Sequence, residues 1–288
     1  MNIYKSKIFT SGWNVAYRRK TGILEDLETP FEVLKNTYRS WAADPFLFEN
    51  NGETYIFAEL YDYSIGRGSI GYHRIGDKNG QWISVISEPY HMSYPQIFIK
   101  NGEIYMMPEA NASGMLYCYR AVHFPDQWEK LEPIRTDVRY VDTTLFDWAG
   151  KELALAYQVD KEPYQLKLLD LQIPENDHSI SVSRINQRRP AGSMDTKRRI
   201  RPAQDCDEDY GKALVFYEYS IDENMNYHET EIARITPEQL SLSKHLYLDG
   251  IHTYNTSDHY EVIDIKTRIF NLISLLSRVK WKVENLRR

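Results

Sequence analysis

The stretch ADPFLFENNGETYIFAE, residues 43–59, decides the fold because the chain repeats it. A second version, SYPQIFIKNGEIYMMPE, spans residues 93–109, and a third, VDTTLFDWAGKELALAYQ, begins at Val141. Two looser versions are RPAQDCDEDYGKALVFYEY from Arg201 and GIHTYNTSDHYEVIDIK from Gly250. The five versions start roughly 50 to 60 residues apart, a period that is typical of stacked supersecondary units rather than of separate domains.

Each version has the pattern of a β-hairpin. β-branched and aromatic residues alternate with polar ones around a turn signal, which is Asn51-Gly52, Asn101-Gly102, Ala149-Gly150 or Tyr210-Gly211. Further strands are expected over residues 68–75, 114–122 and 165–173, so that each unit supplies about four short antiparallel strands, the content of one propeller blade. The sequence therefore predicts an all-β fold, a five-bladed β-propeller over residues 1–266.

The turn signals also predict which residues face each other. Asn-Gly favours a two-residue type I′ turn, because both central residues need positive φ. With these dipeptides as the loops, the expected cross-strand pairs are Asp44–Glu59, Tyr94–Glu109 and Asp142–Tyr157. Directly opposed carboxylates destabilise a sheet. For Asp44 and Glu59 the explanations are that one points into water, that Arg39 or Arg67 neutralises them, or that the pair is functional.

The residues that begin the five hairpins are the candidates for a ligand-binding site. Residues that open the innermost strand of a blade line the mouth of the central channel of a propeller. Here they differ between versions, as expected for five contributions to one asymmetric pocket: Asp44, Tyr94, Asp142, Arg201 and His252. Two carboxyls whose pKa values are pushed apart act as acid and base. The candidate catalytic residues are therefore Asp44, Glu59, Glu109 and Asp142.

The candidate substrate-binding residues surround this set, and they suit a neutral, polyhydroxylated ligand. They are Arg39, Trp41, Tyr94, Arg189, Arg201, Gln204, His252 and Tyr254. Trp41, Tyr94 and Tyr254, together with Trp13, are either platforms for sugar faces or ordinary core residues. The arginine-rich run over residues 188–206 is either a solvated loop or a guanidinium-lined lip for the phosphates of a nucleotide sugar.

Composition and motif searches argue against several other functions. The formal net charge of -6 gives no support to a nucleic-acid partner. No Walker or Rossmann glycine pattern occurs, the eight histidines lack paired-ligand spacing, and the acidic cluster at 205–209 fits no cation motif. We therefore expect no cofactor, no metal and no nucleic acid. The N-terminus lacks the pattern of a secretory signal, so a cytoplasmic location is expected.

The last segment, residues 267–288, breaks the alternating pattern and predicts an amphipathic helix with basic residues after an apolar stripe. One interpretation is that the helix packs across the blades or against a partner. The other is peripheral contact with the anionic inner face of the cell membrane. The expected division is thus a propeller over 1–266 and a helix over 267–288.

Several runs of residues resemble a known family in the same order: AADPFLF, SYPQIF, EIYMMPEANASGMLYCYRA, FPDQWE, RPAQDCDEDYG and GIHTYN. Over residues 13–266 the chain is similar to the N-terminal propeller domain of plant glucosamine inositolphosphorylceramide glycosyltransferases and its stand-alone bacterial relatives. That domain is in turn similar to the five-bladed propellers of glycoside hydrolase family 43. The resemblance implies the propeller fold and a carbohydrate ligand.

The hydrolase resemblance also implies residue roles. Asp44, in Ala43-Asp44-Pro45, matches the catalytic base on the first blade. The second blade opens with Tyr94-Pro95 where that family has an Asp, and the third opens with Asp142, so Glu109 is the nearest candidate acid. This departure argues against ordinary glycoside hydrolysis.

The resulting prediction is a carbohydrate-active propeller of surface-glycan or glycolipid biosynthesis that transfers or remodels a glycosyl unit. Its expected partners are a glycan or nucleotide sugar and a lipid-linked acceptor. Asp44 would be base or nucleophile, Glu109 or Glu59 the acid, and Asp142 their electrostatic partner. The alternatives are a glycoside hydrolase and a non-catalytic module that presents an acceptor to a separate transferase, since the plant proteins are implied to keep that chemistry in another domain.

Overall fold

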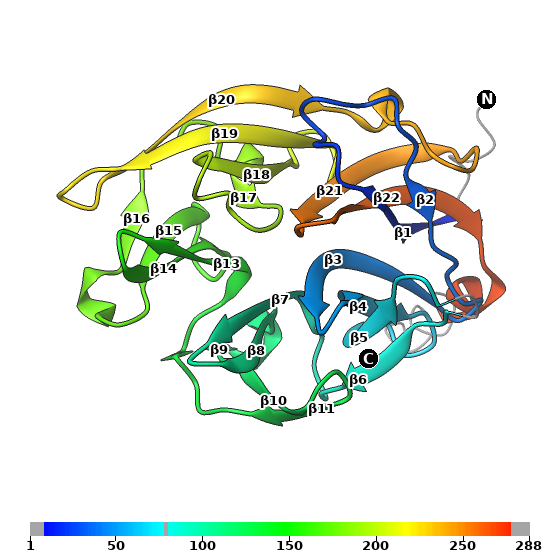
Figure 1. Ribbon diagram of the computed structural model, residues 1–288, viewed down its shortest axis with the longest axis horizontal. Helices are drawn as coiled ribbons and strands as arrows, with labels where there is room; N and C mark the ends of the chain where they lie inside the picture. The colour runs from blue at the N-terminus through cyan, green and yellow to red at the C-terminus, as the bar shows by residue number, and fades with distance from the viewer. Residues whose placement is uncertain (1–8, 78–79, 278–288) are drawn as a thin grey trace, which may run out of the picture.

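The protein is a five-bladed β-propeller with almost no helix (Figure 1). The computed structural model describes residues 9–77 and 80–277. Within these ranges the strands form five four-stranded antiparallel sheets around a common centre. The predicted fold class is therefore confirmed. None of the helices in the described part of the chain has the length and apolar character needed to cross a membrane.

The first three blades follow the chain from the centre outwards. Blade 1 contains β3 (Ser40–Asn50), β4 (Glu53–Asp62), β5 (Arg67–Arg74) and β6 (Ile83–Ile86). Blade 2 contains β7 (Ser93–Lys100), β8 (Glu103–Glu109), β10 (Tyr119–His123) and β11 (Gln127–Lys130), beside a two-stranded ribbon of β9 (Met115–Leu116) and β12 (Arg135–Thr136). Blade 3 contains β13 (Tyr140–Trp148), β14 (Lys151–Gln158), β15 (Gln165–Asp170) and β16 (His178–Ile180).

The last two blades complete the ring. Blade 4 contains β17 (Arg189–Pro190), β18 (Ile200–Asp205), β19 (Ala213–Ile221) and β20 (Tyr227–Ile235). Blade 5 contains β21 (Leu248–Thr256), β22 (Tyr260–Phe270), β1 (Phe9–Arg19) and β2 (Glu32–Val33). The connections hold short 3-10 helices, η2 (Asn111–Ser113), η3 (Pro174–Asn176), η4 (Ile185–Gln187) and η5 (Pro237–Gln239).

Blade 5 joins the two ends of the propeller chain. β1 pairs with β22 along its whole length, from Phe9 opposite Phe270 to Arg19 opposite Tyr260. The first strand of the chain is therefore the third strand of the last blade, and it closes the ring (Figure 1).

Apolar side chains fill the spaces between neighbouring blades. Phe57 and Tyr72 of blade 1 pack with Met106 and Tyr119 of blade 2. The same kind of cluster joins blades 2 and 3, 3 and 4, 4 and 5, and 5 and 1. Because these clusters take up the apolar face of every sheet, polar residues on the innermost strands are left to meet at the centre.

The predicted turns are present in the first three blades. Asn51 and Gly52 both have positive φ (51° and 78°), and Asn101-Gly102 and Ala149-Gly150 repeat this geometry. The register beyond each turn is also as predicted, with Phe46 opposite Phe57. Nearer the start of β3 the pairing register shifts by one residue, so that Ala43, not Asp44, faces Glu59.

This shift is a β-bulge that recurs at equivalent places. In blade 2 it falls between Ser93 and Gln96, and in blade 3 between Val141 and Thr144. The residues within the bulges, Asp44, Tyr94 and Asp142, have φ values of 51°, 49° and 49°. A bulge re-aims a side chain at the expense of one ladder position. Hence the predicted pairs Asp44–Glu59, Tyr94–Glu109 and Asp142–Tyr157 are wrong by one residue.

Two further predictions were wrong in position. The fourth hairpin is formed by the second and third strands of its blade, because the inner strand, β17, has only two residues and leaves no pattern in the sequence. At the C-terminal end, β22 continues to Phe270 and the helix occupies residues 272–277, not 267 onwards. Residues 278–288 of the predicted helix lie outside the described residues.

Candidate functional site

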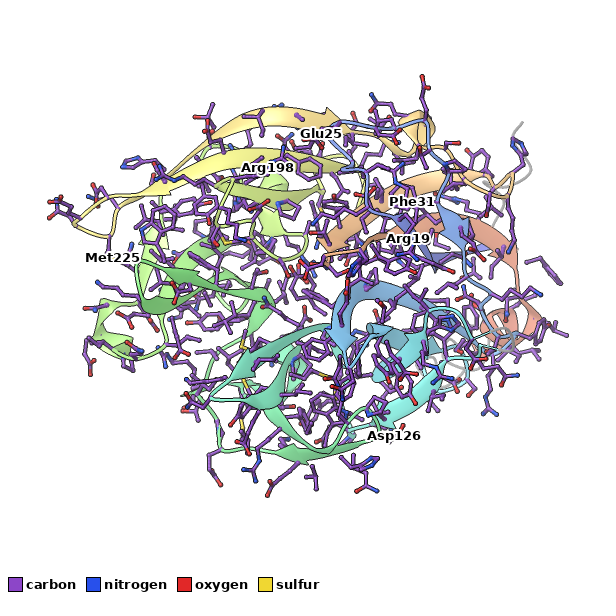
Figure 2. The ribbon with its side chains drawn as sticks, in the orientation of Figure 1. Arg19, Glu25, Phe31, Asp126, Arg198 and Met225 are labelled. Atoms are coloured by element: carbon purple, nitrogen blue, oxygen red, sulfur yellow. The ribbon has the colours of Figure 1, made fainter. Side chains whose placement is uncertain are left out.

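Charged side chains from all five blades meet at the centre of the ring. The centre is filled with side chains of the described residues and is not an open channel (Figure 2). We call this group the central cluster, and it consists of Asp44, Glu59, Glu109, Asp142, Arg189, His252 and Asp264. The four predicted catalytic carboxyls expose only 4, 4, 7 and 1 % of their surface. Carboxylates so deeply buried are costly unless they are paired or protonated. Their hydrogen bonds and ion pairs therefore decide their chemistry.

The bulges bring two of the carboxylates into the cluster. Asp44 and Asp142 have left-handed backbone conformations, which cost roughly 1–2 kcal/mol for a residue with a side chain. Asp tolerates this conformation better than most residues, because its short side chain bonds locally. Tyr94 has the same backbone conformation but a different side chain. The bulge is therefore repeated in blade 2, where it places a phenol instead of a carboxylate.

Asp44 belongs to a network with blade 5. Its Oδ1 accepts a hydrogen bond from Thr253 Oγ1 at 3.0 Å and lies 3.5 Å from His252 Nε2. His252 Nδ1 lies 2.6 Å from Asp264 Oδ2. The imidazole thus bridges two buried carboxylates. Trp13 stacks on it at 3.8 Å between ring centroids and separates it from water.

Asp264 organises this half of the cluster. Its oxygens accept the backbone N–H groups of Asp44 (2.9 Å), His252 (3.1 Å) and Thr253 (2.9 Å). It is fully buried on β22. Several backbone donors stabilise the charged form of a carboxylate. Asp264 therefore fixes the positions of Asp44 and His252.

Asp142 and Glu109 form the other half. Arg189 makes a charge-assisted contact to Asp142 through Nε, and its Nη2 lies 3.3 Å from Asp142 Oδ1. Gln204 donates to Asp142 Oδ2 at 3.0 Å. Glu109 accepts the backbone N–H of Asp142 at 3.1 Å and the Asn111 amide at 2.6 Å. Arg189 and Gln204 thus hold the Asp142 side chain beside Glu109.

The two halves differ in protonation. Burial, partly offset by His252, raises the pKa of Asp44 to about 6. Burial and the neighbouring Asp142 raise the pKa of Glu109 to about 8, although Arg189 opposes this. At neutral pH Asp44 is therefore mainly ionised and Glu109 mainly protonated. An acid and a base within one water-poor site is the arrangement that general acid–base catalysis requires.

Glu59 is the third carboxyl with a displaced pKa. Burial, together with Asp44 and Glu109, raises the pKa of Glu59 well above its ordinary value. Its Oε1 has no hydrogen-bond partner among the described residues and lies 3.5 Å from His91 Nε2. Gly68 N–H donates to His91 Nδ1, so a neutral imidazole carries its proton on Nε2. Burial therefore favours the protonated form of Glu59, which lies next to a half-exposed histidine.

One trio of side chains has the composition of a cation site. Asp44, His252 and Asp264 each offer a ligand atom, and these atoms lie within 4.8 Å of one another. One imidazole and two carboxylates suit a divalent cation. However, the oxygens of Asp264 already accept three backbone N–H groups, so a cation would have to displace existing hydrogen bonds.

Two of the predicted binding residues have a supporting place in the cluster. Gln204 is fully buried and orients Asp142. Tyr94 is also fully buried: its hydroxyl accepts the Gly192 N–H at 2.6 Å and bonds Thr144 at 2.7 Å. Tyr94 therefore ties blade 2 to blades 3 and 4. It is not an open platform for a sugar.

Four other predicted residues lie outside the cluster. Arg39 is exposed and pairs with Asp62, so neutralisation of Asp44 falls to His252. Trp41 stacks on Tyr61 at 4.6 Å, at the rim of blade 1. Tyr254 donates to Glu261 and packs on Phe216, between blades 4 and 5. Arg201 lies on β18, the second strand of its blade, and binds Glu229.

The arginine-rich run does not form a lip over the centre. Arg189 joins the cluster, but Arg198 pairs with Glu25 at the molecular edge, where Figure 2 labels both residues. Arg199 lies over Trp148. The neighbouring acidic residues are also separated: Asp205 contacts Arg234, Asp207 accepts from Gln187, and Asp209 pairs with Lys266.

Sequence reasoning missed Asp264, Thr253, His91 and Tyr210. Tyr210 is 40 % exposed, with the Arg189 guanidinium 5.2 Å from its ring centroid and the His252 ring 5.1 Å away. It therefore lies between the buried cluster and solvent. Asp264 did leave a signal, since it is an acid inside the apolar run Val262-Ile263-Asp264-Ile265. The other three have no distinguishing pattern.

Fold and centre together define a class, the five-bladed propellers with a carboxylate-lined axis. The family model described as glucosamine inositolphosphorylceramide transferase 1, N-terminal, matches residues 29–254, and the chain belongs to this family. The glucosamine inositolphosphorylceramide transferase 1 of Arabidopsis thaliana is 31 % identical over an alignment of 213 residues, and this alignment covers 67 % of this chain and 27 % of that protein. The chain therefore spans about a quarter of the length of this curated relative.

Solved structures show the same fold at low identity. The GH43_1 enzyme from Xanthomonas citri superposes with a TM-score of 0.54 and 13 % identity, covering 81 % of this chain and 88 % of the enzyme. The catalytic domain of the Coprinopsis cinerea GH62 alpha-L-arabinofuranosidase has a TM-score of 0.52 and 9 % identity, covering 88 % of this chain and 97 % of that domain. Both confirm the five-bladed arrangement.

Proposed function

We propose that the chain is a carbohydrate-active propeller of surface-glycan or glycolipid biosynthesis, which transfers or remodels a glycosyl unit at the central cluster. One arrangement carries this proposal: two carboxyls, Asp44 and Glu109, are buried in the same cluster, and burial raises the pKa of Asp44 to about 6 and that of Glu109 to about 8. At neutral pH one is ready to accept a proton and the other to donate one.

The proposed roles follow from the contacts. As the oxygen of an acceptor hydroxyl bonds to the anomeric carbon, Asp44 takes the hydroxyl proton. Glu109 gives its proton to the oxygen that leaves. Thr253 and His252 hold the Asp44 carboxylate, and Asn111 holds Glu109. Arg189 and Tyr210, at the more accessible edge, would contact the ligand.

The family supports a carbohydrate as the ligand, because the Arabidopsis relative is named glucosamine inositolphosphorylceramide transferase 1, and glucosamine is a sugar. We therefore propose a nucleotide sugar or glycan as one substrate and a lipid-linked acceptor as the other. The proposed location is the cytoplasmic face of the membrane. Phe270, Leu272 and Leu276, at the end of the described chain, are 55, 47 and 60 % exposed, and the sequence continues with basic residues.

A second candidate, a non-catalytic module that presents a glycan to a separate transferase, is favoured by the saturation of the cluster. Asp142 is bound by Arg189 and Gln204, and Asp264 by three backbone donors. Carboxylates that several donors hold in place position other groups more readily than they react. Under this proposal the ligand binds through Arg189 and Tyr210, and no bond is made or broken.

Substitution of the two carboxyls distinguishes the candidates. The wild-type chain, Asp44→Asn and Glu109→Gln are incubated with nucleoside-diphosphate sugars and lipid or glycan acceptors. Products are measured by mass spectrometry and binding by calorimetry. Removal of an acid or base is expected to reduce turnover about 10²–10⁴-fold with little change in affinity. Glu132→Gln, an exposed acid, is the control.

Two results would decide against transfer. Turnover of Asp44→Asn at the wild-type rate would remove Asp44 from the reaction. Binding without turnover by the wild-type chain, across the whole panel, would leave only the presenting module.

A further inference from the structure

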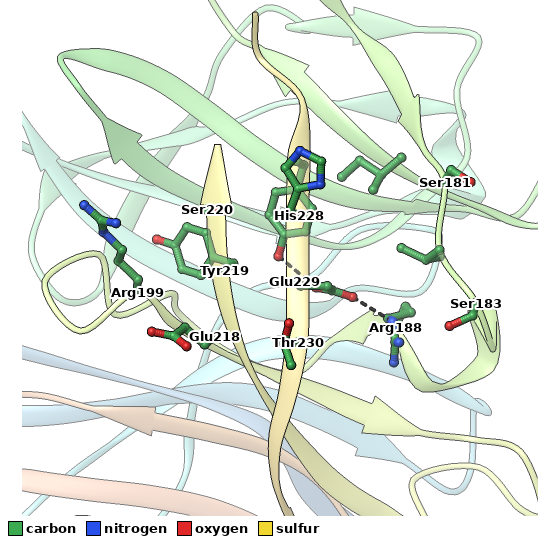
Figure 3. A pocket seen from close by; sticks show the side chains of 13 residues that line it. Ser181, Ser183, Arg188, Arg199, Glu218, Tyr219, Ser220, His228, Glu229 and Thr230 are labelled. Carbon is green, nitrogen blue, oxygen red and sulfur yellow. Dashed lines mark hydrogen bonds and ion pairs between the residues drawn. The ribbon is translucent and has the colours of Figure 1, made fainter. Parts of the chain in front are cut away.

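A separate cavity lies between blades 3 and 4, away from the central cluster (Figure 3). It has a volume of about 610 Å³. Residues 180–183, which follow β16, form one wall, and β19 and β20 form the other. Below it, Ile180 and Leu166 of blade 3 pack against Tyr219 and Tyr227 of blade 4. The floor of this inter-blade pocket is therefore apolar.

At the edge of this floor, two buried arginines share one buried glutamate. Glu229 accepts two hydrogen bonds from Arg201, one from Nε to Oε2 at 2.6 Å and one from Nη2 to Oε1 at 3.0 Å. Its Oε2 also accepts from the Tyr227 hydroxyl at 2.8 Å. Arg188 has to share the same carboxylate, with its Nε 2.7 Å from Oε1 but without the alignment of a hydrogen bond. Two guanidinium groups thus depend on one buried carboxylate.

The guanidinium of Arg188 is the one of the two that has fewer hydrogen-bond partners. Arg188 is 9 % exposed. Its Nη1 contacts the Tyr217 hydroxyl and donates to the Gln187 carbonyl at 3.4 Å, and its guanidinium lies 4.1 Å from the Tyr217 ring centroid, while Nη2 makes no hydrogen bond to the described residues. A further acid, Glu231, pairs with Arg234 at the surface. Burial is the main reason that the pKa of Arg188 is lowered, and Arg201 adds to it. A buried cation with an incomplete set of partners favours an added anion.

The rest of the lining includes three further titratable side chains, Arg199, Glu218 and His228, together with uncharged polar groups. Ser181, Ser183 and Thr230 offer exposed hydroxyls, as Figure 3 shows. Tyr219 is 2 % exposed, and its hydroxyl has no hydrogen-bond partner among the described residues. In Figure 3 this hydroxyl is turned towards the side on which Arg199 lies. A buried hydroxyl without a partner is unfavourable, so a bound polar group would stabilise it.

We propose that the inter-blade pocket binds an anionic sugar, whose phosphate or carboxylate pairs with Arg188 and whose hydroxyls bond the serine, threonine and tyrosine hydroxyls. Planar guanidinium groups recognise both anions through paired hydrogen bonds. The pocket is thus a second carbohydrate site, distinct from the proposed transfer site, and it suits an acidic residue of a growing glycan or a sugar phosphate.

Calorimetric titration of the full chain tests the site. The probes are glucose 1-phosphate, glucuronate, inorganic phosphate and neutral glucose. We expect binding of one or both anionic sugars, weaker binding of inorganic phosphate and none of glucose at equal concentration. In Arg188→Met the affinity for the preferred sugar should fall about tenfold or more, since a charged hydrogen bond is lost. Arg74→Met, which removes an exposed ion pair on blade 1, should bind as the wild type does.

Tyr219→Phe separates binding from folding. It removes only a hydroxyl that lacks a partner, so the unliganded variant should be at least as stable as the wild type. Its affinity for the preferred sugar should fall several-fold, and the sugar should raise its melting temperature less. Several results would overturn the proposal: no binding of either anionic sugar, equal binding of glucose, or unchanged affinity in Arg188→Met. Asp44→Asn should leave this binding intact, which keeps the test independent of the central cluster.

Discussion

Asp264 shows how a single side chain orders a buried site. It binds three backbone N–H groups on two inner strands and the imidazole of His252. Its place in an apolar run was readable from the sequence, but its partners were not. They meet only because blade 5 lies next to blade 1 across the ring closure, a proximity that no local pattern encodes.

The positions and the protonation of the carboxyls were predictable to different degrees. Asp44, Glu109 and Asp142 were expected to converge, and they do. The order of their pKa values was beyond the sequence, because it depends on Arg189 and His252, which approach from blades 4 and 5. Arg201 was assigned to the centre since it begins the fourth repeat, whereas Arg189 occupies that place.

Glu109 predicts how stability depends on pH. Its pKa is about 8 in the folded protein and 4.5 ordinarily. Between these values the unfolded chain is ionised while the folded chain keeps the proton, so the free energy of unfolding falls as pH rises. Gln cannot ionise. Relative to wild type, Glu109→Gln should therefore gain stability from pH 5 to pH 8, by an amount on the order of 2–4 kcal/mol.

Urea unfolding at pH 5, 6.5 and 8 measures this difference. The substitution also disturbs the Asp142 and Asn111 hydrogen bonds, but that loss does not depend on pH in the same way, so only the slope is compared. Glu132→Gln is the reference. A pH-independent difference between Glu109→Gln and wild type would contradict a protonated Glu109.

At the scale of the element, the hairpins were the most predictable feature. Asn-Gly fixes both turn geometry and register, as blades 1 and 2 show. The bulges at Asp44, Tyr94 and Asp142 were not predictable, because they replace one ladder position inside an otherwise regular strand. The two-residue inner strand of blade 4 was invisible for a similar reason: its place is set by packing against blades 3 and 5.

The third turn offers a direct test of the hairpin argument. Ala149 has φ of 51°, a conformation that Asn tolerates better than Ala. We expect Ala149→Asn to increase the free energy of unfolding by about 0.5–1 kcal/mol, and Asn51→Ala to decrease it by a similar amount. Both are measured by urea denaturation at fixed pH. If both substitutions shift stability in the same direction, the turn conformation is not the cause.

At the scale of the whole molecule, the ring depends on β1. The strand pairs with β22 over eleven positions, and its Arg18 forms a 2.5 Å ion pair with fully buried Glu261. The sequence predicted five repeats, but not that the first strand would complete the last blade. The hairpin pattern identifies strands that are neighbours in the chain, whereas this pairing joins residues about 250 positions apart.

Removal of β1 should therefore prevent folding of the entire propeller. A chain that begins at residue 20 leaves the edge of β22 open and Glu261 without its arginine, a loss of about 3–5 kcal/mol from the ion pair alone. We expect aggregation and loss of the β signal in circular dichroism. A peptide of residues 9–19 should restore soluble, folded protein. A truncated chain that folds on its own would show that closure is dispensable.

The same closure determines when the strands of blade 5 can pair during translation. β1 leaves the ribosome long before β22, because its partner becomes available only after some 250 further residues have been translated, which takes about 10–50 s at ordinary elongation rates. Throughout that interval FTSGWNVAYRR has an unsatisfied backbone edge. Translation speed and holdase chaperones should therefore influence the yield of this protein more than that of a propeller whose blades each mature as they emerge.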